Sequence, residues 1–287
     1  MYLILSISSS ATILILFRLF KTYKVNTKQA IVFNYISAFC VGLIASEQPF
    51  RFDAIINSNW LFGAAGLGLL FICVFNLMAI TAQRNGLSVV SVASKMSVII
   101  PISVGVMLYQ EVLSTLQVVG IILALVSVYL VSIKSNDTEQ LNTSLLLPTL
   151  VFFGSGIIDS ALKYFETYHL TQEMIALFSA CIFLFAAIFG AIWIFGLNGQ
   201  NNRTIQIKNI SAGVLLGVVN YYSIYFLIQA LKINWLNSAT VFTINNVTIV
   251  AVSSIIGVLL FKETISKVNL TGIILALLSI ILISTVC

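Results

Sequence analysis

The chain has 287 residues, of which 60% are hydrophobic and 8% are charged, with a formal net charge of +5 and a mean hydropathy of +1.08. Because soluble globular domains carry about 25% charged residues, this composition excludes that class. Apolar runs of roughly 20 residues, enough to cross about 30 Å of hydrocarbon, recur along the chain. Since such segments must satisfy their own backbone hydrogen bonds in lipid, the sequence predicts an all-α integral membrane protein.

Ten transmembrane helices are predicted along the chain. The first is interpreted as a retained span, because it has no basic segment before it and no small-residue cleavage site. The predicted ranges are 2–20, 29–46, 60–80, 87–109, 114–133, 144–163, 172–197, 210–231, 236–261 and 267–286.

The sequence contains an internal repeat. Residues 109–132, YQEVLSTLQVVGIILALVSVYLVS, match residues 261–284, FKETISKVNLTGIILALLSIILIS, at an offset of 152. Residues 16–27, LFRLFKTYKVNT, match residues 161–172, ALKYFETYHLTQ, at an offset of 145. A repeat of this length predicts a duplicated fold. We assign one five-helix repeat to residues 1–135, a linker to 136–143 and a second repeat to 144–287.

Five helices per repeat is an odd number, so the second repeat is expected to enter the membrane in the opposite orientation. Substrate sites of such inverted repeats lie near the membrane midplane, between the two repeats. Loops after odd-numbered helices hold ten Lys and Arg residues, and loops after even-numbered helices hold three. By the positive-inside rule this bias places both termini outside the cytoplasm. A fused repeat needs no dimer to supply both halves, which allows a monomer.

Lys95 is the sharpest candidate for a functional residue. It lies about nine residues into the predicted helix 87–109, roughly 12 Å below the membrane edge at 1.5 Å per residue. An ionisable residue at that depth is costly and usually faces a cavity or a partner. It could bind a substrate carboxylate or phosphate, titrate during transport, pair with Asp159, or extend to the nearer interface. Pro101, six residues on, is expected to kink the same helix.

Asp159 is the second candidate charge inside the membrane. Lys163 follows four residues later, so an i,i+4 pair is one explanation and ion coupling is the other. Glu111 and Glu263 precede predicted helices, where a carboxylate can cap exposed N–H groups.

Several uncharged polar residues are further candidates for substrate binding. Tyr221, Tyr225 and Gln229 recur at i, i+4 and i+8 on one helix face, as a cavity wall or as helix packing. Asn245 and Asn246 occupy nearly the position of Lys95 in the second repeat, and Asn76 lies in the third predicted helix. Their amides could bind substrate or join helices.

The Pro-containing helix, the acidic residue at its end and the Gly-led apolar helix that follows resemble the closing motif of the EamA repeat of the drug/metabolite transporter superfamily. The two copies read IIPISVGVMLYQEVLSTLQVVGIILAL and VAVSSIIGVLLFKETISKVNLTGIILAL. The second copy has Ser253 where the first has Pro101, and the Trp–Gly pair common in the first helix of such proteins is absent. The resemblance implies a multi-pass inner-membrane exporter or exchanger with cytoplasmic termini, against the loop charges.

The sequence predicts no enzyme, no metal site and no cofactor. The one histidine, His169, falls in a loop, and the four cysteines show no C-x-x-C spacing. Basic residues occur singly in loops, so nucleic acid is not an expected partner, and no G-x-x-x-x-G-K-[ST] motif indicates ATP use. We expect a secondary transporter of a small organic metabolite, such as an amino acid or another carboxylate. The alternatives are a non-transporting membrane scaffold or lipid-handling protein, and a channel.

Overall fold

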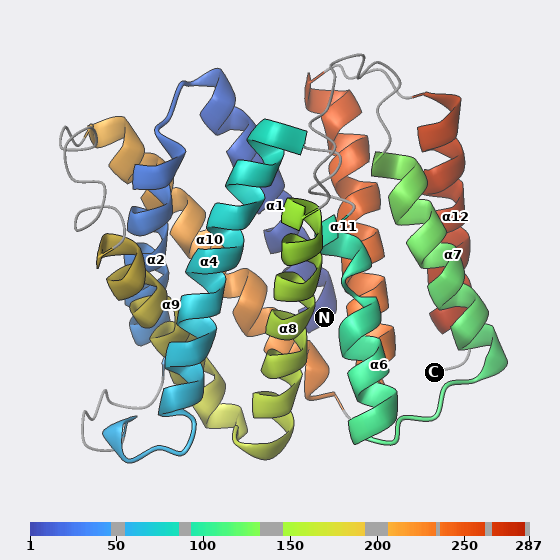
Figure 1. Ribbon diagram of the computed structural model, residues 1–287, viewed down its shortest axis with the longest axis horizontal. Coiled ribbons are helices and arrows are strands. Elements are labelled where there is room, and N and C mark those ends of the chain that lie inside the picture. Colours follow the sequence, from blue (N-terminus) through green and yellow to red (C-terminus); the bar gives the residue numbers. More distant parts are fainter. Residues whose placement is uncertain are drawn as a thin grey trace. The chain divides into compact units, whose positions relative to one another are not determined.

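The computed structural model describes residues 1–46, 55–85, 93–132, 146–192, 206–233, 236–261 and 266–284. Within these ranges the chain forms ten α-helices and one 3-10 helix, and no strand (Figure 1). The elements are α1 (Tyr2–Thr22), α2 (Thr27–Ala45), α4 (Leu61–Asn85), α6 (Ile99–Leu108), α7 (Thr115–Ser132), α8 (Leu146–Tyr168), η1 (Gln172–Met174), α9 (Ile175–Ala191), α10 (Ile207–Leu231), α11 (Ser238–Phe261) and α12 (Lys267–Ser284). The predicted all-α class is confirmed for the described residues.

The helix predicted over 87–109 is described from residue 93 and is interrupted. Residues 93–96 are helical, Ser97 and Val98 form a turn, and α6 then begins at Ile99. Pro101 has no N–H to donate to the Ser97 carbonyl, which accepts a hydrogen bond from Ile100 N instead, at 2.9 Å. The helix is thus interrupted one turn before Pro101, the residue at which a kink was predicted.

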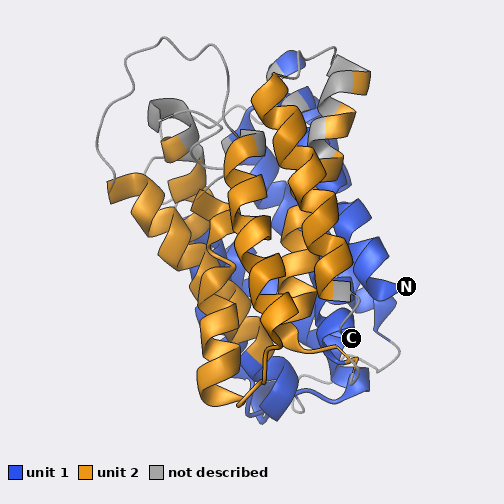
Figure 2. Ribbon diagram, turned by 90° about the vertical axis from the view of Figure 1, so that its right-hand side faces the viewer, with its two compact units in different colours: residues 1–72, 164–232 blue, residues 73–163, 233–287 orange. Residues whose placement is uncertain are grey.

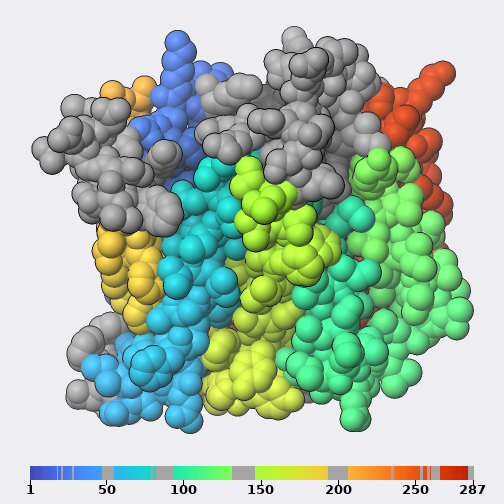
Figure 3. Space-filling view, in the orientation of Figure 1, coloured from blue at the N-terminus to red at the C-terminus, as the bar shows by residue number. Residues whose placement is uncertain are grey.

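Four helical segments are long and apolar enough to cross a membrane: Leu61–Met78, Leu146–Tyr168, Gln172–Ala191 and Ile207–Leu231. The helices α7 and α12 pack against each other and leave apolar side chains exposed on their other faces; those of α7 lie at the surface in Figure 3. Exposed apolar faces of this kind suit contact with lipid or another protein. The exposed residues are Leu116, Val119, Ile122, Val126 and Tyr129 on α7, and Leu270, Ile274, Leu277 and Ile281 on α12. These features are compatible with a membrane protein.

The chain divides into two compact units (Figure 2). Unit 1 comprises Met1–Ile72 and Tyr164–Lys232, and unit 2 comprises Cys73–Lys163 and Ile233–Cys287. Each unit takes segments from both of the predicted repeats, so the division by packing differs from the division by sequence duplication.

Close helix approach at glycine organises unit 1, where α2 packs against α9 and α10. A Cβ atom on Gly217 would lie 2.4 Å from the carbonyl oxygen of Asn34, and a Cβ on Gly68 would lie 2.8 Å from that of Ile182. Gly217 follows Gly68 by 149 positions and Ile182 follows Asn34 by 148. The contact of α10 with α2 is thus matched by one of α4 with α9.

A second matched pair of contacts joins α2 to α9. A Cβ on Gly42 would lie 2.5 Å from Ala180 Cβ, and a Cβ on Gly190 would lie 3.7 Å from Val32 Cγ2. Both Gly42 and Gly190, and Val32 and Ala180, are 148 positions apart. The offset within unit 1 falls between the 145 and 152 found at the ends of the sequence repeat.

Matched hydrogen bonds also begin α7 and α12 in unit 2. Ser114 Oγ accepts from Gln117 N at 3.2 Å while Gln117 Oε1 accepts from Ser114 N at 3.0 Å. Ser266 and Asn269, both 152 positions later, exchange the same two bonds at 3.1 and 3.2 Å. Each pair is a capping box, which satisfies two helix-terminal N–H groups. The repeat seen in sequence therefore extends to local geometry.

We predict that Gly68→Ala lowers the free energy of unfolding by about 1–3 kcal/mol, because the added methyl overpacks the contact of α4 with α9. A Cβ at this position would also lie 2.8 Å from Ala186 N, which is backbone and cannot move aside. Thermal melting of the purified protein in detergent measures the effect.

Gly66 on the same helix provides the matched control, since nothing lies within 4 Å of a Cβ built there. Gly66→Ala should leave stability unchanged or raise it by about 0.5–1 kcal/mol through helix propensity. Equal melting temperatures for the two variants would contradict the close approach at Gly68.

Candidate functional site

Lys95 and Asn246 form the central contact of the candidate site, within unit 2. Lys95 Nζ donates a hydrogen bond to Asn246 Oδ1 at 3.2 Å. Asn246 is 5% exposed, and its Nδ2 has no hydrogen-bond partner among the described residues. A buried amide donor left without an acceptor costs about 1–3 kcal/mol, so it is a position where a ligand atom could bind favourably.

Asp159 on α8 is the second partner of Lys95. The carboxylate of Asp159 and the ammonium group of Lys95 interact favourably through space. Lys163, which follows Asp159 by four residues, has its Nζ 5.8 Å from the centre of the Tyr109 ring. The pairing of Lys95 with Asp159, one of the predicted alternatives, is thus favoured by the electrostatics of unit 2, and the i,i+4 pair of Asp159 with Lys163 stays a prediction.

The two remaining asparagines predicted for the site also belong to unit 2. Asn245 is 5% exposed beside Asn246 on α11, and Asn76 is half-buried on α4. Pro101 lies in the first turn of α6, just beyond the helix interruption that follows Lys95. The sequence candidates in unit 2 are therefore Lys95, Asn245, Asn246, Asp159, Asn76 and Pro101.

The polar stripe Tyr221, Tyr225 and Gln229 lies on α10 in unit 1. The Tyr221 and Tyr225 rings stack at 5.8 Å, and Gln229 Nε2 donates to Tyr225 Oη at 3.1 Å, so the three share a face as predicted. Tyr221 is fully buried with its hydroxyl 3.4 Å from the Ala176 carbonyl oxygen, and Gln229 accepts a hydrogen bond from Gln172. Contacts with α9 and η1 account for the stripe, which favours helix packing over a cavity wall.

Glu111 caps a helix, as predicted, but not the helix that follows it. Its carboxylate accepts hydrogen bonds from Ser238 N at 2.9 Å and Ala239 N at 3.3 Å, at the start of α11. Sequence reasoning considered only the neighbouring helix and therefore missed a contact spanning 127 positions. Glu263 lies outside the described residues.

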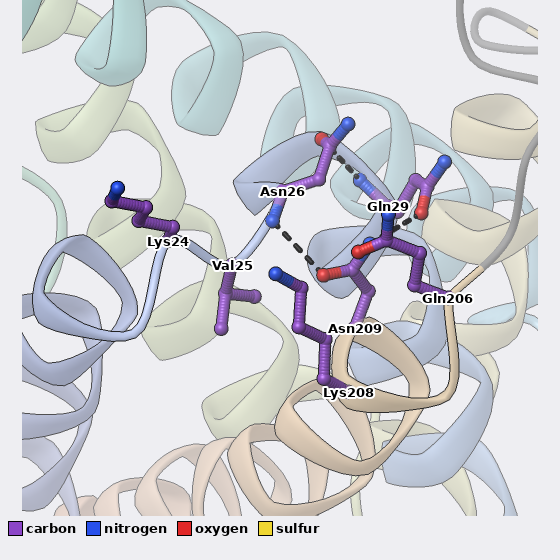
Figure 4. Close-up of a pocket in the computed structure, with 7 residues that line it drawn as sticks. All are labelled: Lys24, Val25, Asn26, Gln29, Gln206, Lys208 and Asn209. Atoms are coloured by element: carbon purple, nitrogen blue, oxygen red, sulfur yellow. Dashed lines mark hydrogen bonds between the residues drawn. The ribbon is translucent and has the colours of Figure 1, made fainter.

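A polar pocket at one end of unit 1 was not predicted. It has a volume of about 410 Å³ and is formed where the segment between α1 and α2 meets the start of α10 (Figure 4). We call it the basic pocket. Its lining residues are Lys24, Val25, Asn26, Gln29, Gln206, Lys208 and Asn209. Sequence reasoning treated Lys24 and Lys208 only as loop charges, because a pocket that both residues line depends on the packing of α2 against α10. Among the described residues no cluster of His, Cys, Asp and Glu could hold a metal ion.

Comparison with known proteins supports the fold without supplying an activity. No family model matches the chain. An uncharacterized protein from Haemophilus influenzae is 28% identical over 284 residues, which cover 97% of this chain and 95% of that protein. A protein of known crystal structure aligns over 100% of this chain and 99% of its own, with a TM-score of 0.74 and 12% identity. The similarity to this crystal structure shows a shared fold alone.

The electrostatic interaction between Lys95 and Asp159 predicts non-additive effects on stability. Lys95→Met and Asp159→Asn should each lower the melting temperature, because each leaves one charge without its counter-charge. The double variant should recover part of the loss, giving a coupling of about 1–3 kcal/mol in a double-mutant cycle. Lys267→Met, which removes an exposed charge on α12, is the control and should combine additively with Asp159→Asn. Additive effects of Lys95→Met and Asp159→Asn would contradict the assigned interaction.

Proposed function

We propose that this protein is a secondary transporter of the drug/metabolite transporter superfamily, with two inverted repeats of five helices in the inner membrane. It would export or exchange a small organic metabolite that carries an anionic group, by alternating access and without ATP. The observation that carries the proposal is the contact of Lys95 with Asn246 inside apolar helices.

The spacing of these two residues supports a position near the axis of the repeat. Lys95 and Asn246 are 151 positions apart, between the offsets of 149 in α4 and α10 and 152 in α7 and α12. They are therefore near-equivalent residues of the two repeats. In a two-fold arrangement, residues that contact their own equivalents lie at the axis. Substrate sites of inverted-repeat transporters lie at the repeat interface near the membrane midplane.

Unit 1 holds a contact of the same kind. Tyr35 of α2 and Phe183 of α9 are 148 positions apart, and their rings stack with centroids 6.1 Å apart. Both are fully buried. This pair is aromatic and the unit 2 pair contains an ammonium group, which favours unit 2 as the location of the chemistry.

The groups around Lys95 favour a particular class of substrate. The Lys95 ammonium group and the Nδ2 donor of Asn246 suit an anionic oxygen of a carboxylate or phosphate. Asp159 supplies a carboxylate that could accept a cationic group of the same substrate. A zwitterionic amino acid satisfies both requirements, so it is the substrate class that we propose first.

The interruption of the helix at Ser97 and Val98 supports a moving element beside the site. Helices that lose a backbone hydrogen bond at proline bend more easily at that point. A change of angle there would move Lys95 relative to α6, and alternating access requires such a change.

The first test measures substrate binding and transport together. Thermal stabilisation by a panel of amino acids and other carboxylates should reveal ligands, since a compound that binds the folded state stabilises it by RT ln(1 + [L]/Kd). Lys95→Met should abolish both the stabilisation and counterflow of that ligand in proteoliposomes, while Lys267→Gln, which removes an exposed charge on α12, should not. Undiminished counterflow in folded Lys95→Met would exclude Lys95 from the site.

A second test separates movement from binding. Pro101→Ala restores the N–H that can bond the Ser97 carbonyl, so it should slow counterflow while leaving the ligand-induced melting shift close to that of the wild type. Pro148→Ala is the matched control, because Pro148 lies in the first turn of α8, where the N–H has no intrahelical acceptor. Equal counterflow rates for Pro101→Ala and the wild type would overturn the assigned movement.

The alternatives make different predictions. A membrane scaffold or lipid-handling protein should give no counterflow with any soluble ligand, and a channel should conduct without saturating.

A further inference from the structure

We propose that the basic pocket of unit 1 binds a phosphate group, of the kind carried by anionic lipid headgroups and by soluble phosphate compounds. This site is separate in sequence and in chemistry from the contact of Lys95 with Asn246, and it does not rest on transport activity.

Buried amides hold the basic pocket together. Asn26 N donates to Asn209 Oδ1 at 3.0 Å, and Asn209 Nδ2 donates to Gln29 Oε1 at 2.6 Å (Figure 4). Gln29 and Asn209 are 3% and 2% exposed. These bonds tie the segment between α1 and α2 to the first turn of α10, so packing fixes the amide part of the pocket wall, while Lys24 and Lys208 are exposed.

The charge of the basic pocket is unbalanced. Its described lining residues include two cations, Lys24 and Lys208, and no carboxylate. An anion bound in the pocket would interact favourably with the ammonium groups of both lysines. The amide side chains add neutral donors, and the helices α2 and α10 both begin here, with their N–H dipoles favouring negative charge.

The size and chemistry of the pocket favour phosphate over a larger polyanion. A volume of about 410 Å³ accommodates a phosphate with a small attached group such as glycerol. Lysine binds phosphate as a point charge and needs no bidentate geometry, so two lysines at one hollow suit the tetrahedral anion.

The duplication provides an internal comparison. At the offsets of 145 and 149, the equivalents of Lys24 and Lys208 are His169 and Asn59. The paired lysines are therefore not a general consequence of the repeated fold. Both occur in loops after odd-numbered predicted helices, which hold most of the Lys and Arg residues. That face is the predicted cytoplasmic one, where anionic lipids attract basic segments.

The test uses the purified full chain in a nonionic detergent, with phosphatidylglycerol and inorganic phosphate as separate probes. Native mass spectrometry should detect one retained phosphatidylglycerol on the wild type. Lys24→Gln and Lys208→Gln should each weaken its apparent affinity about fivefold, as expected for about 1 kcal/mol per lysine. Lys267→Gln removes an exposed charge outside the pocket and should leave the affinity unchanged.

The two probes distinguish the sources of the phosphate. Retention of phosphatidylglycerol without a melting shift from inorganic phosphate indicates a lipid headgroup, and a melting shift from inorganic phosphate that is lost in Lys208→Gln indicates a soluble phosphate compound. Equal binding of both probes by Lys24→Gln, Lys208→Gln and Lys267→Gln would overturn the proposal. Lys95→Met should bind both probes as the wild type does, so a loss of phosphate binding can be distinguished from a loss of transport.

Discussion

Polar atoms inside an apolar chain must find partners within the protein, and this constraint explains most of the described contacts. The Ser114–Gln117 and Ser266–Asn269 boxes satisfy the first N–H groups of α7 and α12, and Glu111 does the same for α11. Buried serines bond the carbonyl three residues before, as Ser127 and Ser279 do at 2.8 Å each. Asn246 Nδ2 is one of a few buried exceptions among the described residues, with Asn34 Nδ2 and Thr248 Oγ1, and of these it is the one beside a charged group.

The sequence was sufficient to predict the helices and the residue at the centre of the candidate site. Hydropathy located the helices because each apolar run is long and bounded by polar residues, and Lys95 was conspicuous because a charge in such a run is rare. The interaction of Asp159 with Lys95 was only one of several predicted alternatives, since a choice between it and the i,i+4 pair depends on tertiary packing. The basic pocket was missed for the same reason, because Asn26 and Asn209 are 183 positions apart.

Duplication followed by divergence explains why the helix contacts of the two repeats match while their polar residues differ. The glycine contacts Gly68 with Ile182 and Gly217 with Asn34 repeat almost atom for atom, because close backbone approach tolerates only small residues. Equivalent positions that are less constrained by packing now hold different residues in the two repeats, and Lys24, for example, corresponds to His169. The framework is thus shared by both repeats, while each proposed site belongs to only one unit.

The interleaving of the two units has a consequence for synthesis. Unit 1 needs both α2, near the N-terminus, and α10, which is complete only at Leu231. Until the ribosome has passed Gly217, the face of α2 that Gly213 and Gly217 contact is uncovered. Contacts between such distant segments slow folding, because the intervening chain must be ordered before they form. The nascent protein therefore carries this apolar face of α2 without its final partner for most of its translation.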